Sequence, residues 1–193
     1  MKIDISCLRH LLKNASLPER PLGFSFQQTS VSFLLFDKKE LHLLAILKAD
    51  NKGYPWRNQV ALPGGHVDEA DKSNIDAARR EMEEEVNISR NNVEFIGSLG
   101  HFQTLNNKDI EVFVGIWNGE GNIRFETAEI SKVLEIPLNS LIKIHIESNF
   151  HGRLPDVMEL VYPFEDVVIW GVTAKMVHFF IELLYPYIEN KGE

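Results

Sequence analysis

Three carboxylates within one short segment are the residues best suited to chemistry in this chain. Residues 79–86 read RREMEEEV, and the spacing of apolar residues around them predicts a helix over 74–86. Residues three and four positions apart share a helix face, so Glu81, Glu84 and Glu85 would stand together. Such like charges repel, and a hard divalent cation held by oxygen ligands would relieve the repulsion. The alternative is an acidic face that is merely solvated.

Two neighbouring features favour the cation site over the solvated face. Residues 63–65 read PGG, and glycine lets a backbone carbonyl approach a metal ion closely. Arg80 lies four residues before Glu84, where it can orient the carboxylates through charge-assisted hydrogen bonds. A surface ion pair between Arg80 and Glu84 would be compatible with that role.

The same segment resembles the signature of the Nudix hydrolases, G-x(5)-E-x(7)-R-E-U-x-E-E-x-G-U, where U is apolar. Gly65 opens the pattern, and Asp71 stands where the signature has its first Glu. Residues 80–88 read REMEEEVNI, with Asn87 in place of the last Gly. Eight residues, rather than seven, separate Asp71 from Arg80.

Further segments are similar to the coenzyme A pyrophosphatase branch of that family. They are 58–65 (NQVALPGG), 64–71 (GGHVDEAD), 129–138 (EISKVLEIPL) and 170–174 (WGVTA). Two segments depart from the branch: 48–50 read KAD where an Arg-Ser-like pair is usual, and 106–108 read NNK where a Ser-Gly turn is common. The resemblance extends from about residue 28 to the end of the chain.

The resemblance implies a hydrolase that uses Mg²⁺ or Mn²⁺ to cleave a pyrophosphate linkage. Its expected substrate is coenzyme A or a derivative, which would give 3′,5′-ADP and 4′-phosphopantetheine. One alternative is another small-molecule nucleoside diphosphate derivative, such as ADP-ribose, a dinucleotide or a nucleoside triphosphate. A second alternative is a Nudix-fold binding module without catalysis.

The resemblance also implies roles for individual residues. The expected metal ligands are Glu81, Glu84, Glu85 and the carbonyl of Gly65. The expected catalytic residues are Glu81 (as a third ligand or the general base), Glu84, the orienting Arg80, and Glu129 as another candidate base. The alternative for Glu129 is an ordinary acid at a helix N-terminus. Asp71 is either near the metal or an N-terminal helix acid, and we favour the latter.

Residues that contact the substrate are harder to predict. Lys48, Lys52 and Arg57 are candidates for the phosphates, and solvated loop cations are the alternative for them. Phe102, like His101, is a candidate to line the pocket, although core packing is the more frequent role of such an aromatic residue. None of the seven histidines has metal-ligand spacing with another, so no histidine site is predicted.

The remaining pattern predicts an α/β fold, a Nudix-like α/β/α sandwich around a mixed β-sheet. Expected strands cover 30–35 and 41–47 (a hairpin), 59–62, 93–99 and 110–116, with two more between 143 and 163. Expected helices cover about 5–12, 74–86, 129–134 and a C-terminal segment from near Thr173. We expect 1–24 to be an N-terminal helical appendage and 25–193 to be one domain.

Composition narrows the class of partner. The 193 residues include 20 Lys and Arg against 28 Asp and Glu, a net charge of −8, which disfavours nucleic acid and anionic membranes. Cys7 is the only cysteine, and the first residues lack the apolar core of a signal peptide. A cytoplasmic protein is therefore expected, with a homodimer included among its expected assemblies.

Overall fold

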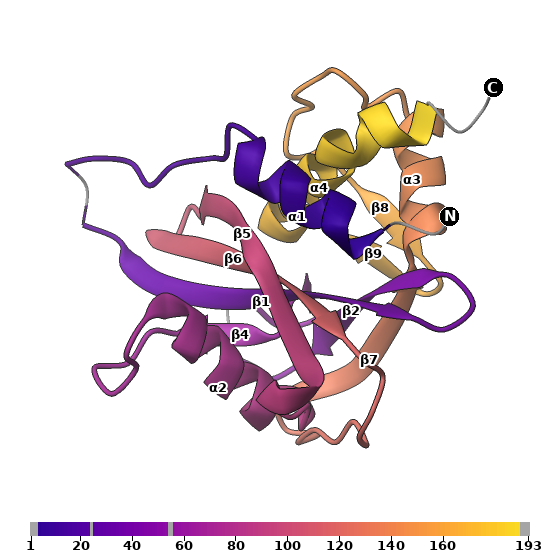
Figure 1. Ribbon diagram of the computed structural model, residues 1–193. Coiled ribbons are helices and arrows are strands. Elements are labelled where there is room, and N and C mark those ends of the chain that lie inside the picture. The colour runs from indigo at the N-terminus through magenta and orange to yellow at the C-terminus, as the bar shows by residue number, and fades with distance from the viewer. Residues whose placement is uncertain (1–3, 24, 54–55, 190–193) are drawn as a thin grey trace.

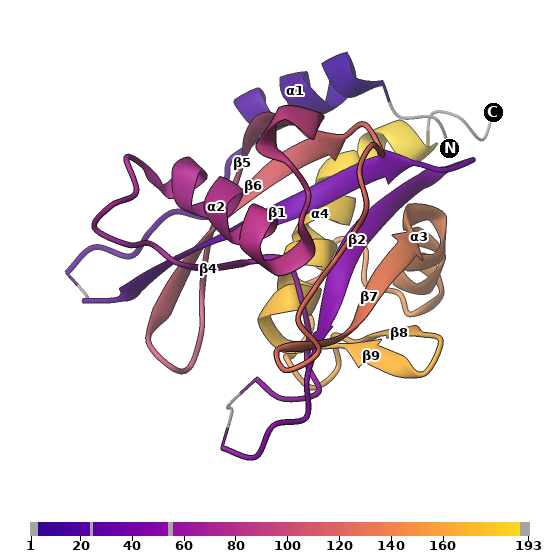
Figure 2. The same ribbon diagram turned by 90° about the horizontal axis from the view of Figure 1, so that it is seen from below.

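The computed structural model describes residues 4–23, 25–53 and 56–189. Within these residues a seven-stranded mixed sheet is covered by helices on both faces (Figure 1). Helix α2 (Asn74–Val86) covers one face, and α1 (Ile5–Asn14), α3 (Leu138–Glu147) and α4 (Gly171–Glu189) cover the other (Figure 2). This arrangement is the expected α/β/α sandwich.

The sheet is built around β1 (Gln27–Asp37), which pairs in parallel with β6 (Lys108–Trp117) and antiparallel with β2 (Leu41–Lys48). Its strand order is β3-β2-β1-β6-β5, with β4 on β1 and β7 on β2. The remaining bounds are β3 Val60–Ala61, β4 Gly64–His66, β5 Val93–Gln103 and β7 Ile130–Pro137. A separate hairpin joins β8 (Tyr162–Phe164) to β9 (Val167–Ile169).

The side chains of β1 alternate between two hydrophobic cores. Phe33 and Leu35 belong to the larger core, on the side of α1, α3 and α4, whereas Leu34 and Phe36 belong to the smaller core beneath α2. Successive side chains of a strand point to opposite faces, so a central strand covered on both sides is buried on both faces. This explains why 31–36 are all buried.

Helix α2 begins and ends where its capping residues predict. The Ser73 hydroxyl accepts a hydrogen bond from the Asp76 amide, and Asn87 adopts the left-handed conformation (φ 56°, ψ 30°) at the C-terminus. Met82 and Val86 are fully buried against the sheet. The opposite side of the helix is left for its charged residues.

Two expected elements differ from the structure. Residues 129–134 were expected to be helical, but 130–137 form β7, whose Ile136 and Leu134 are buried on β2. Two strands were expected within 143–163, but 138–147 form α3, and the strands β8 and β9 follow later. The alternation of isoleucines at 142, 144 and 146 suggests a strand, whereas burial of 138, 141, 142 and 145 follows helical spacing.

The N-terminal helix is confirmed as α1. Leu8 and Leu12 are buried in the larger core, and Leu12 packs beside Gly97 of β5. The boundary between 1–24 and the rest of the chain stays a prediction. No helix in the described ranges is both long enough and apolar enough to cross a membrane.

Candidate active site

A close approach of β4 to α2 forms the base of the site. Gly65 pairs with Ser30 of β1, and a Cβ atom placed on Gly65 would lie 2.5 Å from the carboxylate of Glu81. A Cβ on Gly64 would lie 2.3 Å from the Ser30 carbonyl oxygen, and Gly64 has φ +154°. Gly64 leaves no room for a side chain against β1, whereas a side chain on Gly65 would displace the Glu81 carboxylate.

Glu85 lies in the least exposed part of the carboxylate face. Its side chain is 9% exposed, forms an ion pair with Lys48 of β2, and accepts a hydrogen bond from the Gly64 amide at 2.9 Å. Burial raises the pKa of Glu85, and the charge of Lys48 opposes that rise. Lys48, the last residue of β2, thus places a positive charge beside Glu85 in the last turn of α2.

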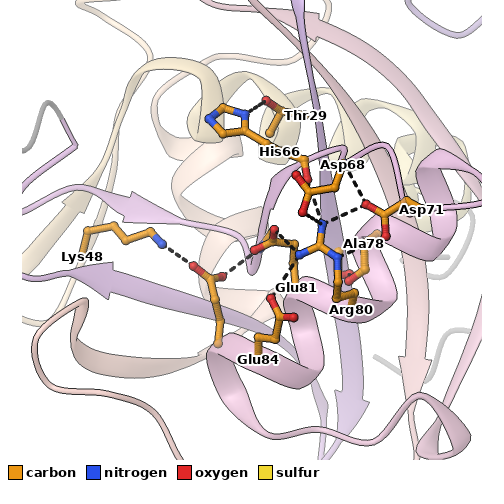
Figure 3. A network of polar contacts seen from close by, with 12 residues as sticks. Thr29, Lys48, His66, Asp68, Asp71, Ala78, Arg80, Glu81 and Glu84 are labelled. Atoms are coloured by element: carbon orange, nitrogen blue, oxygen red, sulfur yellow. Dashed lines mark hydrogen bonds and ion pairs between the residues drawn. The ribbon is translucent and has the colours of Figure 1, made fainter.

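Arg80 organises the other carboxylates, as Figure 3 shows. Its guanidinium donates to Asp71 at 2.9 and 3.1 Å, to Glu81 at 2.7 Å, and to Glu84 at 3.1 Å. A fourth acceptor is the His66 carbonyl at 3.0 Å. Hydrogen bonds to Asp71, followed by those to Glu81, raise the pKa of Arg80, so the guanidinium stays charged.

Asp71 lies outside the first turn of α2, so it is not the N-terminal helix acid that the sequence favours, and its place near a metal stays a prediction. It lies before the N-cap of α2 and is a two-bonded partner of Arg80. Its hydrogen bonds with Arg80 lower the pKa of the Asp71 carboxyl. The carboxylate therefore positions the arginine that in turn holds Glu81 and Glu84.

Of the carboxylates described above, Glu81 and Glu85 border a cavity of about 550 Å³. Of the residues predicted to bind metal or substrate or to act in catalysis, the cavity is lined by Gly65, Lys48, Glu81, Glu85 and Glu129. Glu129 lies in the turn just before β7 rather than at the start of a helix.

The other predicted residues lie outside the cavity lining. The Glu84 side chain is 59% exposed and contacts Arg80, while Arg57 pairs with Asp50 at 3.8 Å on the surface. Phe102 is buried, with its ring edge-on to Phe179 at 5.9 Å. Phe102 therefore packs in the larger core, which is the alternative that sequence reasoning had left open.

Lys108, in the 106–108 segment that departs from the coenzyme A branch, is a residue of the site that the sequence did not single out. It lines the cavity, its ammonium lies 5.0 Å from the centre of the Trp56 ring, and it lies 3.4 Å from Nε2 of His66. Burial lowers the pKa of Lys108, and the nearby charge of Lys48 adds to this effect. In the sequence, Lys108 is only the last residue of an expected turn. The parallel pairing of β6 with β1 brings it to the cavity.

The cavity also has an apolar wall and an oxygen-rich floor. Val60, Leu62, Val172 and Met176 supply the apolar surface. The carboxylates of Glu81 and Glu85 and the backbone of Gly65 supply the oxygen donors. Oxygen donors of this kind suit Mg²⁺ or Mn²⁺, so the residues present fit a hard divalent cation.

The family model described as the NUDIX domain matches residues 26–156. The chain belongs to the Nudix family. A relative in Photorhabdus laumondii, the uncharacterized Nudix hydrolase NudL, is 32% identical over 124 residues, which are 62% of this chain and 65% of the relative. NudL of Escherichia coli K12 is 34% identical over 121 residues, 62% of this chain and 63% of the relative. The chain thus spans just under two thirds of each relative.

Solved Nudix structures share the fold. A binary complex of the Caenorhabditis elegans Ap4A hydrolase aligns with a TM-score of 0.54 and 16% identity, over 83% of this chain and 98% of that one. A MutT/nudix family protein from Enterococcus faecalis aligns with a TM-score of 0.54 and 19% identity, over 96% and 76%. At these identities the likeness extends to the sandwich alone, and it confirms the predicted fold.

Proposed function

We propose that this Nudix protein is a metal-dependent hydrolase of the pyrophosphate linkage in coenzyme A or its derivatives, with 3′,5′-ADP and 4′-phosphopantetheine as products. The observation that carries the proposal is one cavity lined by the carboxylates Glu81 and Glu85 and by the cations Lys48 and Lys108. Such a cavity combines ligands for a divalent ion with charges that attract phosphate. Family membership and the hydrolase relatives support the enzyme class.

The carboxylate face would hold Mg²⁺ or Mn²⁺ through Glu81, Glu84, Glu85 and the Gly65 carbonyl. The bound ion would neutralise the diphosphate and lower the pKa of a water molecule. Arg80 keeps Glu81 and Glu84 in place through the bonds described above. Either Glu81 or Glu129 would accept the proton of the attacking water, because both line the cavity.

The lysines and the apolar wall would contact different parts of the substrate. Lys48 and Lys108 are placed to contact the phosphate oxygens. Trp56 lies under the Lys108 ammonium, next to the space that an organic group of the substrate would occupy. Val172 and Met176 at the start of α4 would contact the uncharged part.

Three separate segments support coenzyme A over other substrates. The segments that resemble the coenzyme A branch supply Gln59 to Leu62, Glu129 and Thr173 to the same cavity. Two of these segments are joined directly, because the Thr173 hydroxyl donates a hydrogen bond to the Val60 carbonyl at 2.9 Å. Sequence features far apart in the chain are thus explained by one shared surface.

A product screen tests the substrate. The purified protein is incubated with Mg²⁺ or Mn²⁺ and with coenzyme A, ADP-ribose, a dinucleoside polyphosphate or ATP, and products are identified by mass spectrometry. We expect 3′,5′-ADP and 4′-phosphopantetheine from coenzyme A. If coenzyme A stays intact while ADP-ribose is cleaved, the result would contradict coenzyme A as the substrate. Binding without cleavage of any compound would favour the non-catalytic module.

One substitution and one control variant distinguish the two candidate bases, Glu81 and Glu129. If Glu129 accepts the proton, Glu129→Gln should lower kcat by about 10²- to 10⁴-fold with KM little changed. Glu126→Gln is the matched control, because Glu126 lies in the same turn and contributes its backbone carbonyl. A Glu129→Gln rate equal to that of the control would assign the proton transfer to Glu81.

A further inference from the structure

A second cluster of metal-binding side chains lies on the face of the sheet opposite α2. It consists of His145 in α3, His151 in the loop after α3, and Glu182 in α4. Their ligand atoms all lie within 4.8 Å of one another. Glu182 is nine residues beyond Thr173, so about 14 Å of helix separates the cluster from the cavity.

The ligand atoms of the three side chains already converge. One Glu182 oxygen lies 2.8 Å from Nε2 of His145 and 2.9 Å from Nδ1 of His151. The second Glu182 oxygen accepts a hydrogen bond from the Gly152 amide at 3.0 Å. Two imidazole nitrogens that converge on one carboxylate oxygen form a ligand set that sequence spacing did not reveal, because the residues come from three elements.

Surrounding residues fix the orientation of this set. His145 is fully buried, and its Nδ1 lies 2.9 Å from the Tyr162 hydroxyl. The His151 ring stacks on Tyr185 with 3.3 Å between ring centroids. A histidine that ligates a metal usually uses its other nitrogen to donate to a neighbouring acceptor, and the Tyr162 oxygen is available for that bond.

We propose that His145 Nε2, His151 Nδ1 and a carboxylate oxygen of Glu182 bind a zinc ion. Two histidines and one glutamate are an established ligand set for zinc, with water in the fourth position. Imidazole also favours zinc over Mg²⁺, so the site differs in chemistry from the carboxylate face of α2. The His151 side chain is 44% exposed, which gives the ion a path from solvent.

Binding of a zinc ion requires the three ligand atoms to change their separations. Bonds of zinc to nitrogen and oxygen imply ligand atoms about 3.3 Å apart in a tetrahedron. The present oxygen–nitrogen separations of 2.8 and 2.9 Å are those of hydrogen bonds and must lengthen by about 0.5 Å, and the two imidazole nitrogens, now within 4.8 Å of each other, must also reach this spacing. Each neutral imidazole keeps one proton: that of His145 moves to Nδ1, towards Tyr162, and that of His151 moves to Nε2.

A bound ion would join three elements. It would connect α3, the loop that leads to β8, and α4 at one point, where hydrogen bonds now join His145 and His151 to Glu182. A ligand that binds the folded chain alone stabilises it in proportion to its occupancy. Zinc should therefore raise the Tm of the protein.

Equilibrium dialysis of the full chain tests the site. The protein is treated with a chelator and dialysed against Zn²⁺ in excess Mg²⁺, which is added to compete for the oxygen ligands of α2. We expect one zinc ion per chain, with zinc affinity reduced about tenfold or more in His151→Ala and in Glu182→Gln. His10→Ala is the matched control, because His10 is exposed in α1 and should leave zinc binding unchanged.

The thermal melt provides the second readout. Zinc should raise the Tm of the wild-type chain and of His10→Ala, and it should leave the Tm of His151→Ala unchanged. Circular dichroism of His151→Ala without zinc checks that the variant is folded. A wild-type chain that binds no zinc would show the cluster to be a hydrogen-bonded tie and overturn the proposal. Zinc binding retained at wild-type affinity by both cluster variants would also overturn it.

Discussion

Arg80 shows how one side chain can order a whole site. A guanidinium carries five N–H donors in a rigid fork, and Arg80 distributes them over Asp71, Glu81, Glu84 and a backbone carbonyl. Because Arg80 remains charged, it offsets the repulsion between carboxylates that would otherwise move apart. The site is therefore largely assembled by the chain's own cations, Arg80 on one side and Lys48 on the other.

The glycines of β4 provide a test at the level of single residues. In Gly65→Ala the new methyl group would meet the movable end of Glu81, so the carboxylate should shift while the fold persists. A displacement of about 1 Å in an active site costs about 10²-fold in rate, and we expect a loss of that size. Hydrolysis rate and urea unfolding, measured together, check this result.

Gly64→Ala is the contrasting substitution. Its methyl group would meet the backbone oxygen of Ser30, which cannot move without the strand, and Gly64 has a positive φ. We expect a loss of about 3 kcal/mol or more in the free energy of unfolding. Equal stability of the two variants would contradict the close approach of β4 to β1.

At the level of elements, the loop between β4 and α2 positions the helix's own arginine. Asp71→Asn should weaken the bonds to Arg80, lower the free energy of unfolding by about 1.5–3 kcal/mol and reduce activity by about 10- to 100-fold. Asp68→Asn is the control, because Asp68 is 64% exposed and lies 3.5 Å from Arg80. We expect its effect on stability to stay below about 1 kcal/mol.

The two loop variants are compared by urea unfolding and by steady-state hydrolysis. If Asp71→Asn and Asp68→Asn behaved alike, the two-bonded contact between Asp71 and Arg80 would have no special part in the site.

Local signals explain which elements could be predicted. Helix α2 carries its own caps and apolar stripe, so its bounds followed from the sequence. The strand β7 gains its structure from pairing with β2, and α3 gains its structure from burial against α4 and the sheet, so their short patterns were ambiguous. Lys108 was missed for the same reason: the parallel pairing of β6 with β1 brings it to the cavity, and parallel pairing has no local signature.

The whole molecule is organised as two cores separated by the sheet. The smaller core supports α2 and the carboxylate face, and the larger core holds α1, α3 and α4. The net charge of −8 is concentrated on the side of α2. Residues 66–90 contain eight acids and four bases, which account for half of the excess negative charge. The acidity that disfavours nucleic acid is thus concentrated where oxygen ligands are useful.

The place of α1 in the larger core has a measurable consequence. Leu8 is 2% exposed and contributes to that core, so Leu8→Ala should lower the free energy of unfolding by about 2–5 kcal/mol. Ile5→Ala is the control on the same helix, because Ile5 is 39% exposed, and its effect should stay within about 0.5 kcal/mol. A Leu8→Ala variant as stable as Ile5→Ala would indicate that α1 is an appendage that the core does not need.

The central claim is that the carboxylates of α2 bind a divalent cation and support hydrolysis. Glu81 is the best residue to substitute in a test of this claim, because Glu85→Gln would also leave the buried Lys48 without its partner. Glu83→Gln is the control: Glu83 lies on the same helix and pairs with Arg90 instead.

The deciding measurement is the rate of coenzyme A hydrolysis as Mg²⁺ is added to the chelator-treated protein. The wild type and Glu83→Gln should be inactive without the ion and recover fully with it, whereas Glu81→Gln should remain about 10²- to 10⁴-fold slower at saturating Mg²⁺. Hydrolysis that continues in the presence of chelator, or a Glu81→Gln rate equal to that of Glu83→Gln, would contradict the claim.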